Sequence, residues 1–91
     1  MKIKWIDMGD GEFKFTKQVT PLIIMAILHY NPITAKGNFI IYIAGNLYYQ
    51  NNFYDVTLEQ AKSHAVAAFI SVMTDFVKNV DYMVWSVTNE Y

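Results

Sequence analysis

Apolar and polar residues alternate over residues 2–5 and 12–15, and the segments that contain them, residues 2–8 and 12–18, predict two β-strands. The Gly-Asp-Gly sequence at residues 9–11 is typical of a tight hairpin turn, because glycine adopts positive φ angles without strain. A two-residue turn here predicts that Asp7 lies opposite Lys14, which is a favourable cross-strand pair. A three-residue loop would change this register.

The next segment, residues 21–30, is almost entirely apolar. Thr20 suits the N-cap of a helix and Pro21 suits its first position, while Asn31-Pro32 would end the helix. These signals predict a helix that is apolar on all sides and is therefore buried. The β-branched isoleucines of the segment leave a strand as the alternative.

Residues 39–54 predict a second hairpin, since two runs of strand-forming residues flank Gly45-Asn46. A two-residue turn at Gly45-Asn46 would pair Tyr42 with Tyr49 on one face of the sheet. The second run is aromatic at first and becomes polar after Tyr49, where we expect it to leave the core.

A capping box at Thr57 and Gln60 predicts the start of a long helix that extends to about residue 79. Apolar residues recur at helical spacing and form a wide stripe. The stripe contains Leu58, Ala61, Ala65, Phe69, Val72, Phe76 and Val80, and it is widened by Val66, Ile70, Met73 and Val77. Residues 82–88 then predict a closing strand, because apolar side chains occupy alternate positions.

These elements predict a single α+β domain over residues 1–91, with the order ββαββαβ. We expect an antiparallel sheet of about five strands with two helices packed on one face. No linker or low-complexity segment divides the chain.

Composition adds a constraint on the surface. Hydrophobic residues make up 54% of a chain of 91 residues. A domain of this size buries only about 60–65% of the surface that its unfolded chain exposes, so one small core does not easily hold so much apolar material. Either the packing is very efficient, or apolar surface meets a partner or a second copy.

The charge pattern disfavours nucleic acid as a partner. The positive charges are seven lysines with no arginine, against eight acidic residues, for a net charge of −1. Arginine is the residue best suited to bidentate contacts with phosphate and guanine, and nucleic-acid binders usually carry a basic patch. The chain also has no cysteine, which excludes disulfides and thiolate metal sites.

The N-terminal region carries Asp7, Asp10 and Glu12, where a signal peptide requires an apolar segment. The longest unbroken apolar run, residues 22–28, is too short to span a bilayer. We therefore expect a cytoplasmic protein with no membrane partner, located in the host cytoplasm if a phage encodes it.

Catalytic and metal-binding patterns are not found in the sequence. His29 and His64 are the only histidines, and neither lies in a cluster with the spacing of metal ligands. Asp7, Asp10 and Glu12 flank a glycine turn, where acidic residues are favoured for conformational reasons rather than for acid–base chemistry. We therefore expect a protein that is not an enzyme and holds no cofactor or metal.

A concentration of aromatic and amide side chains offers the best candidate for a binding surface. Tyrosine is enriched at protein interfaces because it combines a large apolar body with a polar tip, although it also fits half-buried strands. We call this segment the aromatic arm and predict that it binds a protein partner. The aromatic arm consists of Tyr48, Tyr49, Gln50, Asn51, Asn52, Phe53 and Tyr54.

The chain resembles small phage-encoded inhibitor proteins of the anti-CRISPR type in its size, its lack of cysteine, and its short hairpins with one long helix. Its composition, rich in Lys, Asn, Ile and Tyr, would suit an AT-rich phage genome. The resemblance implies a non-enzymatic inhibitor that binds a host defence or transcription protein and blocks it by direct contact.

Two other functions remain open from the sequence. The first is a small nucleic-acid-binding domain that uses the aromatic residues of the sheet for stacking. The second is a self-assembling structural homodimer, in which the wide apolar stripe of the long helix forms the interface.

Overall fold

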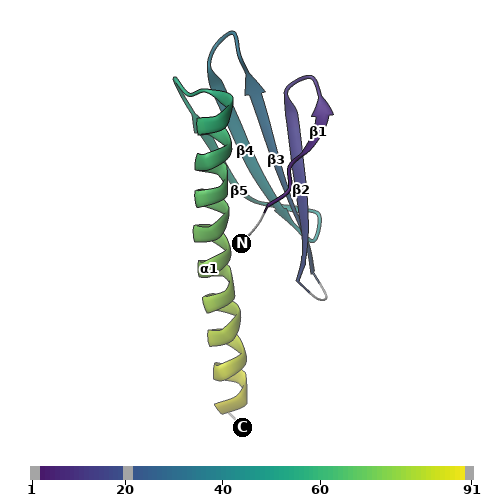
Figure 1. Cartoon of the computed structure of the whole chain (residues 1–91). Helices are drawn as coiled ribbons and strands as arrows, with labels where there is room; N and C mark the ends of the chain where they lie inside the picture. Colours follow the sequence, from purple (N-terminus) through teal and green to yellow (C-terminus); the bar gives the residue numbers. More distant parts are fainter. Residues whose placement is uncertain (1–2, 20–21, 90–91) are drawn as a thin grey trace.

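The structure, a computed structural model, describes residues 3–19 and 22–89. It consists of a five-stranded antiparallel sheet followed by one long helix (Figure 1). The elements are β1 (Ile6–Gly9), β2 (Glu12–Val19), β3 (Leu22–Asn31), β4 (Lys36–Ile43), β5 (Asn46–Phe53) and α1 (Leu58–Asn89). The predicted α+β class and the five-stranded antiparallel sheet are therefore confirmed, whereas the second helix and the order ββαββαβ are wrong.

Each strand pairs with its neighbours in sequence, in the order β1-β2-β3-β4-β5, so the sheet is a meander of hairpins. Helix α1 covers one face of this sheet, which we call the inner face, and it continues past the end of the strands (Figure 1). The opposite face, which we call the outer face, is not covered by any described element.

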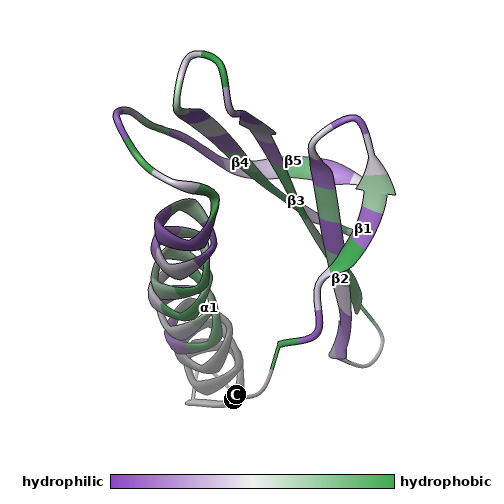
Figure 2. Ribbon diagram, turned by 45° about the horizontal axis from the view of Figure 1, so that its top comes forward, coloured by the Kyte–Doolittle hydropathy of each residue, from purple (hydrophilic) through white to green (hydrophobic). Residues whose placement is uncertain are grey.

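The helix predicted over residues 21–30 is instead the central strand β3. Its burial alternates strictly, with Ile24, Ala26 and Leu28 buried on the inner face. The sequence hides this alternation because the outer-face positions between them are apolar as well. Figure 2 shows the contrast with β2, in which hydrophobic and hydrophilic residues alternate. The predicted helix start at Thr20-Pro21 lies outside the described residues.

The closing strand predicted over residues 82–88 is wrong too, because α1 runs without interruption to Asn89. The sequence after Thr57 contains neither glycine nor proline, the two residues that most strongly interrupt a helix. Once the helix has started, nothing in the local sequence ends it at residue 79. The start at Leu58 is as predicted.

The β4–β5 hairpin turns one residue earlier than predicted. Ala44 and Gly45 have φ angles of 52° and 81°, which is the pattern of a type I′ turn, and Ile43 pairs with Asn46. The register also shifts after Ile41, so that Ile41 lies opposite Tyr49. The predicted Tyr42–Tyr49 pair is therefore wrong.

The β1–β2 hairpin does turn at Asp10-Gly11, but the register shifts between Asp7 and Gly9. Asp7 consequently lies opposite Phe13, and its predicted pairing with Lys14 is wrong. The Asp7 carboxylate accepts a hydrogen bond from the Gly9 N–H at 2.9 Å, which stabilises the bulge locally.

The core lies between the inner face and α1. Its centre is an aromatic stack in which Phe15 contacts Phe69 of α1 and Trp5 of the N-terminal segment, each with ring centroids 4.8 Å apart and edge to face. At the start of α1, Ala61 meets Gly37 of β4 closely, because glycine there leaves no side chain between helix and sheet. The buried residues are Phe15, Ile24, Ala26, Leu28, Phe39, Ile41, Ile43, Ala61, Ala65 and Phe69.

The capping box at the start of α1 forms as predicted. The Thr57 N–H donates to Gln60 Oε1 at 2.9 Å, and the Gln60 N–H donates to Thr57 Oγ1 at 3.2 Å. Both bonds satisfy backbone donors that the first turn of a helix otherwise leaves free.

We expect Thr57→Ala to lower the free energy of unfolding by about 1 kcal/mol, because it leaves the Gln60 N–H without its side-chain acceptor. Urea unfolding followed by circular dichroism measures this difference. Thr57→Ser keeps the acceptor oxygen and serves as the matched control. An equal loss in both variants would show that the methyl group, and not the cap, stabilises the helix start.

Candidate protein-binding surfaces

The aromatic arm covers residues 48–53 of strand β5 and the residue that follows the strand, at the edge of the sheet. Three of its side chains have structural roles. Tyr49 is half-buried and stacks edge to face on Phe39, with ring centroids 6.5 Å apart. Phe53 packs against the core, and Asn52 accepts a hydrogen bond of 2.7 Å from the Asn38 side chain.

The other members of the aromatic arm are exposed. Gln50 and Asn51 point to solvent in the middle of β5. Tyr48 is held in place by an edge-to-face contact with Phe76 of α1, at 5.5 Å between ring centroids. Tyr54 lies after the strand, with the Lys36 ammonium 5.4 Å from its ring centre. The structure therefore presents the two outermost tyrosines at opposite ends of the strand.

A groove runs between β5 and α1. It has a volume of about 400 Å³, and Ala68 and Val72 line its helix side. Tyr48 and Tyr49 line the strand side, whereas Asp75 supplies a negative charge from α1. The groove thus lies directly beside an edge strand, and its lining combines apolar side chains with the polar groups of Ser71 and Asp75.

The backbone of β5 offers hydrogen-bonding groups along this edge. Within the described sheet, β5 pairs only with β4. The Asn52 N–H donates to the side chain of its neighbour Asn51 at 2.9 Å, so this N–H is directed away from β4. Because backbone groups alternate in direction along an antiparallel strand, the Gln50 N–H is directed outward as well.

A second uncovered surface lies on the outer face of the sheet, where neighbouring strands place apolar side chains side by side. Ile27 pairs with Ile40, Met25 pairs with Tyr42, and Tyr42 pairs with Leu47. Paired residues share one face, so these side chains form a continuous surface. We call it the outer patch, and it contains Ile23, Met25, Ile27, Ile40, Tyr42 and Leu47.

The outer patch ends at a row of polar side chains that crosses four strands. Glu12 lies opposite His29, His29 opposite Asn38, and Asn38 opposite Asn52. The Asn38–Asn52 hydrogen bond ties the last two together. His29 is exposed in this row, on strand β3.

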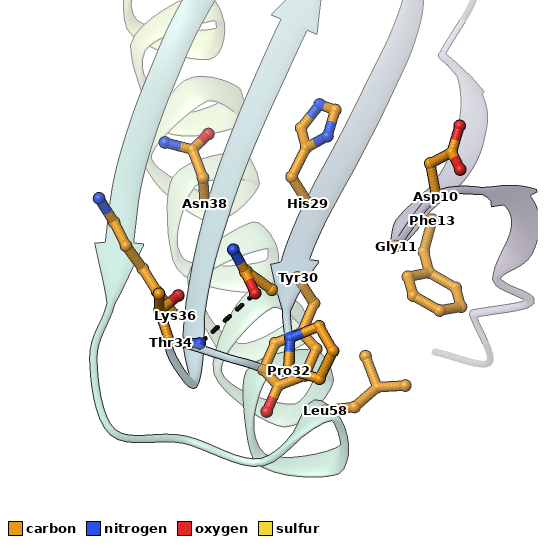
Figure 3. A pocket seen from close by; sticks show the side chains of 11 residues that line it. Asp10, Gly11, Phe13, His29, Tyr30, Pro32, Thr34, Lys36, Asn38 and Leu58 are labelled. Carbon is orange, nitrogen blue, oxygen red and sulfur yellow. Dashed lines mark hydrogen bonds between the residues drawn. The ribbon is translucent and has the colours of Figure 1, made fainter.

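Figure 3 shows a depression at this polar end, with a volume of about 790 Å³. His29 and Asn38 lie side by side on neighbouring strands, while Tyr30, Pro32 and Leu58 gather at the other side of the depression (Figure 3). The Tyr30 hydroxyl donates to the Val56 carbonyl at 2.7 Å. The other polar groups that line the depression come from separate turns and strands, and they do not converge on one point.

The other titratable residues considered from the sequence are dispersed. His64 lies on α1 with its ring 5.4 Å from that of Phe53. Asp10 lies in the β1–β2 turn with a φ of 53°, which is a conformational role. Within the described ranges, no cluster of three or more His, Asp or Glu residues could hold a metal ion.

Comparisons with protein-family models, with curated proteins and with solved structures find no significant match. Among the described residues, no helix combines the length and the apolar character needed to cross a membrane.

Sequence reasoning located the aromatic arm but missed the outer patch. The signal was present in the unbroken apolar run of residues 22–28, which is long enough for a strand buried on both faces. Interpreting that run as a helix removed the strand whose outer face carries Ile23, Met25 and Ile27.

Proposed function

We propose that this chain is a non-enzymatic protein-binding module whose partner contributes an extended segment that pairs with the edge of β5. The observation that carries the proposal is the groove between β5 and α1, which lies beside outward-directed backbone groups. In this mode of recognition, main-chain hydrogen bonds provide affinity and adjacent pockets select side chains.

The groove indicates the chemistry of the segment. Alternate side chains of an added strand would point toward α1, where Ala68 and Val72 favour apolar groups of moderate size. Asp75 lines the same groove. Its negative carboxylate favours a basic residue two positions further along the added strand, where the side chain again points toward α1. Tyr48, already positioned by Phe76, loses little side-chain freedom on binding and suits the role of an anchor.

The resemblance to phage-encoded inhibitors suggests what such binding accomplishes. A partner that donates a strand to β5 is brought against the exposed tyrosines and the long helix. We infer that the partner is a host protein and that the bulk of this domain covers a functional surface on it. Blocking a partner in this way requires tight binding to it but no catalytic step.

We expect Gln50→Pro to weaken partner binding by about tenfold or more, which corresponds to roughly 1.4 kcal/mol. Proline removes an outward N–H that an added strand would use, while an edge position tolerates proline without loss of the β4 pairing. The experiment captures proteins from a nuclease-treated host lysate on the tagged chain and then measures the affinity of the purified partner by calorimetry.

Gln50→Ala is the matched control, since it removes the side chain and keeps the N–H. Binding should be retained in Gln50→Ala and lost in Gln50→Pro, with both variants folded by circular dichroism. Equal binding by all three proteins would refute strand addition to β5. Equal loss in both variants would mean that the Gln50 side chain makes the contact.

A further inference from the structure

We propose that α1 forms an antiparallel pair with α1 of a second copy of this chain, so that the end of each helix lies beside the sheet of the other copy. The contact uses the flank of α1 opposite to the one that borders the β5 groove, and it is independent of the proposed function. It specifies how the long helix joins two copies, which its wide apolar stripe alone leaves open.

A second series of apolar residues runs along α1 beside the residues that pack on the sheet. Its members recur at alternating steps of four and three residues, which is the spacing of the positions that face a partner helix in a coiled coil. Among its described side chains, Met73 packs against the core, whereas Ile70 and Val77 are 44% and 49% exposed. We call it the flank series, and it consists of Val66, Ile70, Met73, Val77, Val80, Val84 and Val87.

The last part of α1 extends past the sheet. Phe76 is the last residue of α1 that packs against the described core, yet the helix continues to Asn89 (Figure 1). At 1.5 Å per residue, residues 77–89 extend about 19 Å beyond Phe76. This segment still contains four members of the flank series. The coiled-coil spacing therefore continues where packing against the chain's own sheet does not require it.

A groove beside the first half of α1 provides a place for such a helix end. A helix is about 10–12 Å across and strands lie about 4.8 Å apart, so one helix covers two or three strands. Helix α1 lies against β3, β4 and β5, and the inner face of β2 is therefore to its side. Trp5 packs on Phe15 of β2 there, and a groove of about 550 Å³ is lined by Trp5 and by Val66 and Ile70 of α1. The groove thus lies on the flank of α1 that carries the flank series.

An antiparallel pair brings the free helix end of each copy to the groove of the other. If a two-fold axis passes between Val77 of the two copies, Asn89 lies level with Ala65 of the other helix, because the two residues are equally far from Val77 along the sequence. The end of α1 then runs along the groove, and the two sheets lie at opposite ends of the pair. A parallel pair would bring both sheets to the same end and would leave both helix ends without a sheet beside them.

The residue types of the flank series allow a second copy to be the partner. The series contains no charged residue, and β-branched residues occupy every second position from Ile70, as is common in coiled coils. Charges at the positions that border such a series select the partner helix, and here the bordering positions within residues 66–88 contain a single charge, Asp81. Nothing in this pattern selects against a second copy. Because this chain carries both the groove and the free helix end, a second copy supplies what each of them lacks.

Sedimentation velocity of the full chain over a range of concentrations tests the pairing. We expect a monomer–dimer equilibrium with a dissociation constant in the micromolar range, so that dilute protein is monomeric, because the flank series spans only about three heptads. Val77→Glu places two like charges at the two-fold axis and should raise the dissociation constant at least about a hundredfold. The variant should stay folded by circular dichroism, since Val77 is half exposed in the single chain. Lys78→Glu is the matched control, because it introduces the same residue outside the flank series and should dimerise like the wild type.

Cross-linking tests the direction of the pair without charged substitutions. The chain has no cysteine, so Ala67→Cys and Thr88→Cys each introduce a single thiol. Positions 67 and 88 of different copies are neighbours in the antiparallel pair, and a short bismaleimide should therefore join the two variants when they are mixed. Joining of Ala67→Cys to itself alone would indicate a parallel pair and would overturn the proposal. A wild-type chain that stays monomeric at millimolar concentration, or a dimer that Val77→Glu does not weaken, would overturn it as well. Gln50→Pro should leave the dimer intact.

Discussion

Replacing Phe69 with alanine is expected to lower the free energy of unfolding by about 3–5 kcal/mol. Phe69 is only 1% exposed and stacks on Phe15, which in turn stacks on Trp5. The substitution therefore leaves a cavity in the core where α1, β2 and the N-terminal segment meet. Because a small domain has only about 5–15 kcal/mol in total, this loss removes a large part of its stability.

Urea unfolding at one fixed protein concentration measures the effect, since any self-association adds to the apparent stability. Ile70→Ala is the matched control, because the neighbouring side chain is 44% exposed and should change the free energy of unfolding by less than about 0.5 kcal/mol. Phe69→Leu should fall between the two. Similar losses for Phe69→Ala and Ile70→Ala would show that the aromatic stack does not hold α1 on the sheet.

How far the sequence predicts this fold depends on whether a signal is local. The capping box and the apolar stripe of α1 are local, and they located the helix start at Leu58 and the buried Ala61, Ala65 and Phe69. The end of α1 was missed because alternating apolar residues in 82–88 satisfy a strand pattern equally well. For the β3 segment a helix was preferred and a strand was only the alternative, because a strand with two apolar faces has no alternation to detect.

The candidate site shows the same limit. The aromatic arm is visible in the sequence because its residue types are unusual in their concentration. Which of its side chains face the core depends on a one-residue shift in the β4–β5 register, and such a shift moves a side chain to the opposite face. The outer patch depends on contacts between three strands, so pairing within one hairpin could not reveal it.

Gly11→Ala is expected to be among the most destabilising changes at a turn, with a loss of about 2–5 kcal/mol in the free energy of unfolding. Gly11 has a φ of 76°, which is costly for any residue with a side chain. A Cβ atom there would also overlap the Tyr30 backbone carbonyl oxygen. The Tyr30 N–H donates to the Gly11 carbonyl at 2.8 Å, so the two backbones cannot separate without losing this bond.

Gly9→Ala isolates the two contributions, since Gly9 has a φ of 85° in the same turn and open space where a Cβ would lie. This variant should lose only the conformational part, about 1–2 kcal/mol. The difference between the two variants, measured by urea unfolding, then reports the contact between the β1–β2 turn and the end of β3. If both variants lose the same amount, the close approach of Gly11 to the Tyr30 carbonyl does not contribute to stability, and the turn does not pack against the end of β3.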